Sequence, residues 1–324
     1  MPLGISYECE PDFVKPFCWA PDGFTYLGVK ITLKISQLYA ENVNPMVKHI
    51  KDKMLSWKKL PVSFLGRVNL IKMTILPKII YPLSMLFISL KRNNIKDINK
   101  AISDFIWAGR KPKIKLDILQ LPKEQGGWGL PNITFYTTSM QARIISIWSA
   151  AKPKPPWFDI EATFSKPYSP VNLLDKRRSE LPIMAKDNYL INNVCSTWNS
   201  LRKLFGSKHK LSCLTTLTDN PELTRGDTGP NFQNWYEAGI YHIYDLWDRG
   251  KFKTFESLQA TYKLQTKEFY KYLQVRHYVY TKMDTLNLPE DFNSLENTLS
   301  DSLKQGHFVS KFYSKLQYLK TDRL

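Results

Sequence analysis

The sequence predicts a mainly α-helical fold with a short extended region near its start. Over most of the chain after residue 43, apolar residues recur at spacings of three and four, which is the period of an amphipathic helix. Residues 24–32 (FTYLGVKIT) are instead rich in β-branched and aromatic side chains and follow a Pro-Asp-Gly turn, as strands do. Hydrophobic residues make up 43% of the 324 residues. That share suffices for a buried core, and the length suggests about two domains.

Two helices are predicted directly after this extended region. The first has Asn44 and Pro45 in its first turn and an apolar face that reaches Trp57. The second has Ser63 as its N-cap residue and runs toward Pro77, which should end or kink it.

Two more helices are predicted on either side of a glycine-rich turn. The helix before the turn covers residues 95–106 and leads into a basic loop, residues 107–115. Residues 125–131 (QGGWGLP) form the turn, which we expect to pack closely against a neighbouring helix. The helix after it has an apolar side made of Tyr136, Met140, Ile144 and Trp148.

Positive charge is concentrated in one part of the chain. The net charge is +17, and residues 45–125 hold 17 Lys and Arg against 5 Asp and Glu, a net charge of +12. Arg67, Thr74 and Lys78 fall on one face of a helical wheel. Cations neutralise phosphates, and the aromatic residues interleaved here stack on bases. The pattern therefore favours a groove for nucleic acid over its alternative, a solvated basic surface. The densest basic run is Arg110, Lys111, Lys113 and Lys115.

A proline-rich stretch predicts a domain boundary. Residues 152–156 read KPKPP, a stiff polyproline-type spacer. Further apolar positions at helical spacing follow it, among them Ile191, Val194, Trp198 and Leu201. The predicted organisation is an N-terminal region 1–35, a helical domain 36–150, a linker 151–183 and a second helical domain 184–324.

Several classes of protein are disfavoured by what the sequence lacks. Its longest apolar stretch, residues 73–90, is interrupted by prolines and a lysine, so no membrane span is expected. No signal peptide is recognisable, which favours an intracellular protein, cytoplasmic or nuclear. The four cysteines have neither zinc-ligand nor C-x-x-C spacing and are expected to be reduced thiols. No catalytic motif is present, and we expect Asp245 and Asp248 to have a structural role.

Six separate strings are the most specific feature of the sequence. They read FTYLGVKI at residues 24–31, WKxLPxSxLGRVxLIKMxILPKIIY at 57–81, FIW at 105–107, GGWGLP at 126–131, WxxAGIxxIxDL at 235–246 and FYxYLQxRH at 269–277. In this order they resemble the reverse transcriptases of LINE-type (non-LTR) retrotransposons of the vertebrate LINE-one clade.

The resemblance implies a role for each region. Tyr26, Leu27 and Gly28 look like the primer-grip hairpin that closes the palm, so residues 1–35 would be a β-hairpin remnant of a palm. Residues 36–150 would then be a thumb-like helical domain, followed by the helical region after the thumb. The resemblance also implies contact with an RNA–DNA hybrid and its primer end. The cations then expected near backbone phosphates are Lys58, Lys59, Arg67, Lys72 and Lys78.

The resemblance also implies what this chain does not do. A complete family member has an endonuclease, fingers, a palm with a Tyr/Phe-x-Asp-Asp metal motif and a Cys/His-rich tail. This sequence carries none of those motifs, so we expect a non-catalytic fragment without catalytic or metal-binding residues. No cofactor is expected, since Mg²⁺ would serve only the complete parent enzyme.

The expected partners are RNA, an RNA–DNA hybrid and the missing palm and fingers of a parent polyprotein. Two other functions stay open. The chain could be a decayed or co-opted protein-interaction module, or it could support polymerase activity when a palm is supplied in trans.

Overall fold

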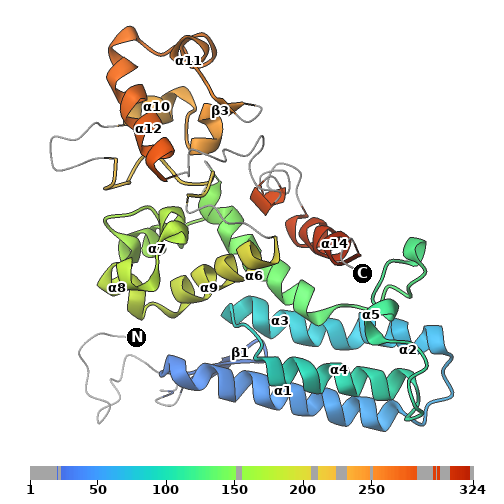
Figure 1. Ribbon diagram of the computed structural model, residues 1–324. Helices are drawn as coiled ribbons and strands as arrows, with labels where there is room; N and C mark the ends of the chain where they lie inside the picture. The colour runs from blue at the N-terminus through green and yellow to red at the C-terminus, as the bar shows by residue number, and fades with distance from the viewer. Residues whose placement is uncertain are drawn as a thin grey trace, which may run out of the picture. The chain divides into compact units, whose positions relative to one another are not determined.

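The computed structural model describes residues 20, 23–150, 155–205, 211–223, 232–248, 251–282, 295–296, 298–299 and 307–321. The described residues are mainly α-helical, with strands only in two small antiparallel hairpins (Figure 1), which confirms the predicted fold class. The chain divides into two compact units, Met1–Thr137 (unit 1) and Thr138–Leu324 (unit 2).

Unit 1 begins with a hairpin of β1 (Phe24–Tyr26) and β2 (Val29–Ile31). The two turn residues, Leu27 and Gly28, have φ angles of 47° and 78°. Positive φ at both positions matches the twist of the flanking strands, as in a type I′ turn. The side chain of Asn42 accepts a hydrogen bond from the Lys30 amide and donates one to the Lys30 carbonyl, both at 2.8 Å. The hairpin is thereby fastened to the first helix.

The first helix starts earlier than the sequence predicts. It is α1 (Ile35–Trp57), so Pro45 lies inside it, and the placement of Asn44 and Pro45 in the first turn was wrong. A proline removes one N–H from the helical ladder. Here Pro45 and Glu41, whose carbonyl loses its partner, are both exposed, so water can satisfy the carbonyl. Helix α4 (Arg92–Ile106) packs along α1 (Figure 1).

The second predicted helix is continued through a wide turn. Helix α2 (Phe64–Leu70) is capped as predicted, with Ser63 Oγ accepting from the Gly66 amide at 3.2 Å. A π-helical turn, η2 (Ile71–Ile75), then joins it to α3 (Leu76–Leu86). The Leu76 amide bonds to the carbonyl of Ile71, five residues back. This widened turn falls directly before Pro77, where an ordinary helix would set the proline ring against a carbonyl. The chain therefore stays helical past Pro77.

The glycine-rich turn packs against backbone. It follows α5 (Leu116–Leu119) and η3 (Lys123–Gln125) and precedes α6 (Ile133–Ser149). The amides of Trp128 and Leu130 both donate to the Leu119 carbonyl, at 3.1 and 3.0 Å. A Cβ at Gly127 would collide with the Leu121 carbonyl. The close approach expected of this turn is thus made to residues 119–121.

Unit 2 contains helices within the predicted linker. Residues 151–154 lie outside the described residues, but α7 (Phe158–Ser165), η4 (Pro170–Asp175) and η5 (Arg178–Glu180) follow. Most of η4 is buried, so this part of residues 151–183 is folded rather than an extended spacer. Next come α8 (Ile183–Asp187) and α9 (Tyr189–Leu204). The predicted apolar face of α9 is confirmed, with Ile191, Val194, Trp198 and Leu201 buried.

The described remainder of unit 2 consists of short helices and strands and of two longer helices. They are α10 (Gln233–Ala238), η6 (Ile243–Leu246), β3 (Trp247–Asp248), β4 (Lys251–Phe252), α11 (Phe255–Tyr262), η7 (Thr266–Glu268), α12 (Phe269–Lys282) and α14 (Phe308–Thr321). The Asp245 carboxylate accepts from the amides of Tyr241 and His242, at 2.8 and 2.9 Å. It therefore caps η6, the structural role expected of it. No helix in the described residues combines the length and apolarity that a membrane span requires.

Candidate nucleic-acid interface

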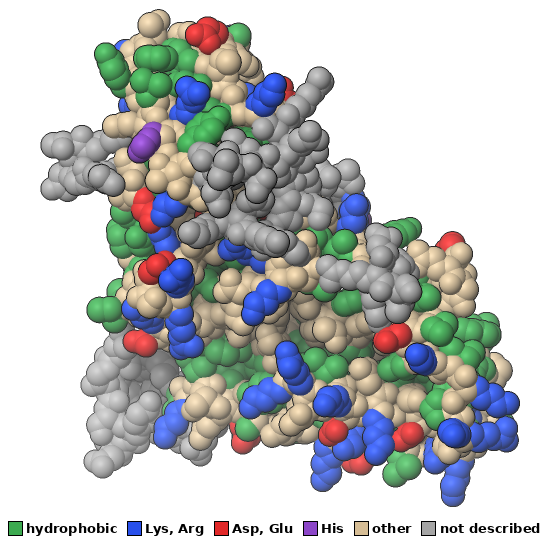
Figure 2. Space-filling model, viewed as in Figure 1, with side chains coloured by type: hydrophobic (Ala, Val, Ile, Leu, Met, Phe, Trp, Pro, Cys, Tyr) green, Lys and Arg blue, Asp and Glu red, His purple; other side chains and the backbone are tan. Residues whose placement is uncertain are grey.

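The basic segment of the sequence forms a basic surface on unit 1. Figure 2 shows Lys and Arg side chains gathered over the region that Figure 1 labels α1, α2 and α4. The predicted contact residues differ in exposure. Lys59, Arg110, Lys111, Lys113 and Lys115 are exposed, whereas Lys58, Lys72 and Lys78 are half-buried and Arg67 is buried.

Arg67 has a structural position that the sequence did not reveal. Its side chain is only 7% exposed. Nη1 donates to the Phe105 carbonyl at 2.9 Å, and Nη2 donates to the Leu60 carbonyl at 3.1 Å. Longer bonds reach the carbonyls of Val62 and Lys58, at 3.3 and 3.4 Å. Because these bonds occupy the guanidinium inside unit 1, the assignment of Arg67 to a phosphate contact is corrected to a structural role.

Three aromatic side chains from distant segments meet beside α2, and we call them the ring cluster: Phe64, Trp107 and Trp128. The Phe64 ring makes edge contacts with Trp107 at 5.4 Å and with Trp128 at 4.9 Å between centroids. Trp128 is 37% exposed and Trp107 is partly exposed. Aromatic rings that are partly exposed can stack on bases or sugars.

Half-buried lysines flank the ring cluster. The Lys58 amine lies over Gly109 in the loop after Trp107, where any Cβ would collide with it. The Lys72 amine lies near Gly129, with Nζ 3.2 Å from where a Cβ would be. Burial, and then the charge of Lys123, lower the pKa of Lys72. The cluster thus carries cations at its edge, and two glycines leave the room that these amines occupy.

A second group of basic side chains lies between α1 and α3. We call His49, Lys53 and Lys78 the amine cluster. Lys78 Nζ lies 2.9 Å from His49 Nε2. Burial lowers the pKa of Lys78, and a hydrogen bond and the charge of Lys53 lower it further. His49 and Lys53 were missed in the sequence, although their spacing of four residues, repeated at Trp57, places all three on one face of a helix.

The primer-grip-like residues lie at the hairpin tip. Tyr26 ends β1 opposite Val29, and Leu27 and Gly28 form the turn. Tyr26 and Leu27 are 54% and 67% exposed. The hairpin therefore presents apolar side chains to solvent, and it is part of the same unit as the ring cluster and the amine cluster.

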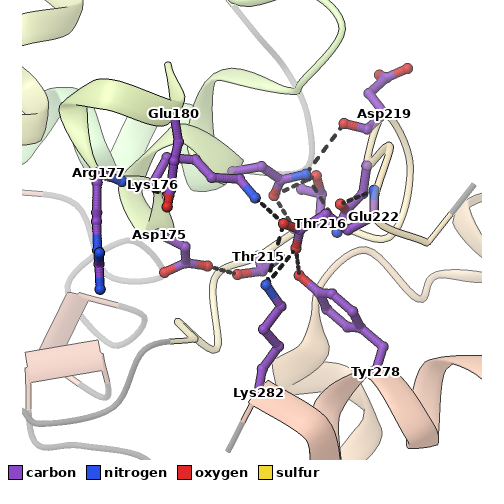
Figure 3. Close-up of polar contacts among 12 residues, drawn as sticks. Asp175, Lys176, Arg177, Glu180, Thr215, Thr216, Asp219, Glu222, Tyr278 and Lys282 are labelled. Atoms are coloured by element: carbon purple, nitrogen blue, oxygen red, sulfur yellow. Dashed lines mark hydrogen bonds and ion pairs between the residues drawn. The ribbon is translucent and has the colours of Figure 1, made fainter. Parts of the chain in front are cut away.

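Unit 2 contains a polar network that the sequence did not predict. Figure 3 shows the Glu222 carboxylate facing Lys176, which follows η4, and Tyr278 and Lys282, which both belong to α12. Glu222 forms ion pairs with Lys176 and, at 3.1 Å, with Lys282, and accepts from the Tyr278 hydroxyl at 3.1 Å. Burial is the largest single influence on the pKa of Glu222 and raises it, but Lys176 and Lys282 together hold that pKa below its ordinary value.

Two further carboxylates hold the segment that begins at Leu211. Asp175 accepts from the Ser212 amide at 2.9 Å and from the Thr215 hydroxyl, and Glu296 accepts from the Cys213 amide at 3.0 Å. Burial raises the pKa of Asp175 to about 6 and that of Glu296 to about 7. Both carboxylates accept hydrogen bonds from backbone amides, so we assign Asp175 and Glu296 a structural role rather than an acid–base one.

The described cysteines are buried free thiols, as predicted. Burial raises the pKa of Cys195 to about 12 and raises that of Cys213 as well, which makes both unreactive. Cys9 and Cys18 lie outside the described residues. Within the described residues no three His, Cys, Asp or Glu side chains converge as metal ligands would, and the lack of a cofactor stays a prediction. No known protein-family model matches the chain.

Proposed function

We propose that this chain binds nucleic acid through the basic and aromatic surface of unit 1, with little sequence preference and without catalysing a reaction. The ligand we propose is an RNA–DNA hybrid or structured RNA. This choice follows the resemblance to LINE-type reverse transcriptases. On the same proposal, the protein would act inside the cell, in the cytoplasm or nucleus.

One observation supports the proposal above all others. The ring cluster brings three aromatic side chains from separate segments to one place, with the amines of Lys58 and Lys72 beside it. The exposed run Arg110, Lys111, Lys113 and Lys115 belongs to the loop that begins at Trp107. A purely solvated basic surface gives no reason for partly exposed tryptophans among its cations. Binding of nucleic acid gives such a reason, because the rings can stack on sugars or bases while the cations neutralise phosphates.

Fluorescence anisotropy with labelled RNA–DNA hybrid, single-stranded RNA and duplex DNA tests the proposal. At two salt concentrations, log K should fall with log salt by about 0.9 per phosphate contacted on a duplex. Replacing Lys111, Lys113 and Lys115 by Gln should weaken binding and flatten that dependence. Replacing three exposed cations of unit 2, Arg178, Lys203 and Lys267, removes the same charge and should change the affinity much less. Absent or salt-independent binding would refute the proposal.

The lack of catalysis has its own test. A primer-extension assay with Mg²⁺, a primed RNA template and deoxynucleotides should give no product with this chain alone. Repeating the assay with a separately supplied palm and fingers examines activity in trans. Extension by the chain alone would refute the non-catalytic part of the proposal.

A second candidate function, a protein-interaction module, is favoured by the hairpin. Phe24, Tyr26 and Leu27 are each more than half exposed, and so are Leu33 and Ile35. Apolar side chains gathered in one short segment are typical of a surface that another protein covers. Replacing Phe24, Tyr26 and Leu27 by Ser should leave nucleic-acid binding intact if unit 1 acts through its basic surface. It should abolish partner binding if the hairpin is the functional surface.

A further inference from the structure

The amine cluster is a group of basic side chains whose two lysines form no ion pair with a carboxylate of the described residues. Lys78 Nζ lies 2.9 Å from His49 Nε2, so the lysine donates and the imidazole accepts. The Lys53 amine is close enough to Lys78 to lower its pKa. Among the described residues, no carboxylate lies within ion-pair distance of the Lys53 or Lys78 amine. Two neighbouring ammonium groups repel each other, and a negative charge between them offsets the repulsion.

The positions of these side chains are set by helices α1 and α3 and by the ring of Trp57. His49 and Lys53 are one helical turn apart on α1, and Lys78 comes from the first turn of α3, which packs on α1. The Lys53 amine also lies over the Trp57 ring, 5.0 Å from its centroid. The stem of Lys53 is thereby held along the helix, and its ammonium stays near Lys78. Because these side chains are already held in place, they lose less conformational entropy when a small anion binds.

We propose that His49, Lys53 and Lys78 form a binding site for a single phosphate group. Both amines would donate to the phosphate oxygens, and His49, released from Lys78, would donate Nε2–H when protonated. The phosphate would be a backbone phosphodiester of the nucleic acid or a free phosphate ion. The first source depends on the proposed function, whereas the second does not.

The direct test uses inorganic phosphate and the imidazole ring of His49. Ring ¹H–¹³C spectra of the full chain are recorded while phosphate replaces chloride at constant pH and ionic strength, with His49 identified by its loss in His49→Gln. The His49 resonance should shift saturably in the wild-type chain. It should stay in place in Lys53→Gln/Lys78→Gln. A matched control, Lys51→Gln/Lys96→Gln, removes the same charge from exposed positions elsewhere on α1 and on α4 and should keep the wild-type shift.

A second measurement identifies the source of the phosphate. The salt dependence of hybrid binding should flatten by about 0.9 in Lys53→Gln/Lys78→Gln, the effect of losing one phosphate contact. Two lysines on separate phosphates would flatten it by about 1.8 and refute the shared site. A His49 shift with an unchanged salt dependence would assign the site to free phosphate. A His49 shift without any hybrid binding by the wild-type chain would refute the proposed function and support this site.

The proposal is overturned if phosphate leaves the His49 resonance unmoved. It is also overturned if the two double variants respond alike, since the response would then reflect net charge alone. Circular dichroism of all variants checks that the fold is retained, which we expect because the substituted lysines are not buried.

Discussion

Nη1 of Arg67 donates a hydrogen bond to the carbonyl oxygen of Phe105 at 2.9 Å, and the guanidinium lies 5.0 Å from the centre of the Phe105 ring. This contact joins α2 to the end of α4. Replacing Arg67 by Met should destabilise unit 1 by about 3 kcal/mol, because buried carbonyls lose their donors. Arg67→Lys should be destabilising too, since one ammonium cannot reproduce the guanidinium geometry.

Urea unfolding followed by tryptophan fluorescence measures this change. Lys59→Met, at an exposed position nearby, is the control and should stay within about 0.5 kcal/mol of wild type. Wild-type stability in Arg67→Met would show that the buried bonds contribute little. If Arg67→Met is unstable as expected, its loss of nucleic-acid binding would say nothing about a phosphate contact.

Leu27 adopts a left-handed backbone, with φ of 47°, at the tip of the hairpin. Most side chains with a Cβ are disfavoured there by about 1–2 kcal/mol, whereas Gly has no Cβ and Asn, whose short polar side chain bonds to nearby backbone, tolerates the conformation. Leu27→Asn should therefore slow hydrogen exchange of the Lys30 amide, which bonds to Asn42. Leu33→Asn, another exposed leucine but without positive φ, should leave the exchange rate unchanged. Faster exchange in Leu27→Asn would contradict the assigned strain.

Gly127 has no room for a side chain beside the Leu121 carbonyl. Gly127→Ala should destabilise unit 1 by at least about 2 kcal/mol, since backbone rather than a flexible side chain must move. It should also alter tryptophan fluorescence through the contact of Phe64 with Trp128. Gly28→Ala, where a Cβ meets open space and only φ is unfavourable, should cost about 1 kcal/mol. Thermal unfolding of both variants makes the comparison, and equal losses would rule out the steric explanation.

Unit 2 should lose stability as the pH rises through the weakly acidic range. The pKa values of Asp175 and Glu296 are raised to about 6 and about 7 in the folded chain, mainly by burial, above ordinary values of 3.8 and 4.5. Between the unfolded and folded pKa the native state binds more protons. Its stability is therefore greatest below the unfolded pKa and is lost as the pH rises through the folded one, by at most about 1.4 kcal/mol per pH unit for each group.

Glu296→Gln tests this pH dependence, because glutamine keeps an acceptor for the Cys213 amide without a charge. Denaturant unfolding between pH 4.5 and pH 8 should show a flatter pH profile in the variant than in wild type. Glu237→Gln, at an exposed position of α10, should retain the wild-type profile. Parallel profiles for wild type and Glu296→Gln would mean that Glu296 is ionised at low pH in the folded state.

Local sequence signals predicted local structure well. Ser63 caps α2 as its position before the helix indicates, and Asp245 caps η6. In both, the side chain bonds within four residues of itself, so neighbouring residues carry the whole signal. The predicted start of α1 was wrong because proline is common in the first turn of a helix. Here the helix begins ten residues before Pro45, and Asn42 in this added part bonds to the hairpin at Lys30.

Interactions between distant residues were not predictable in the same way. The burial of Arg67 depends on the Phe105 carbonyl, 38 residues later, and the π turn before Pro77 leaves no mark in apolar spacing. In the candidate interface, the basic loop and glycine turn were recognised separately. Their meeting through Phe64, Trp107 and Trp128 requires the tertiary fold. The amine cluster was half visible, as His49 and Lys53 share a helical face, but Lys78 joins them only when α3 packs on α1.

The contacts of Glu222 affect when unit 2 can fold during synthesis on the ribosome. Its partners Lys176 and Lys282 are separated by more than a hundred residues, and Tyr278 also belongs to the later segment. A growing chain that has emerged as far as Glu222 still lacks two of the three groups that neutralise or bond this carboxylate. Long-range ties of this kind slow folding, because the intervening loop must close first. Unit 2 therefore reaches its final arrangement only after α12 has been synthesised, and a chain truncated before Tyr278 would leave Glu222 with Lys176 alone.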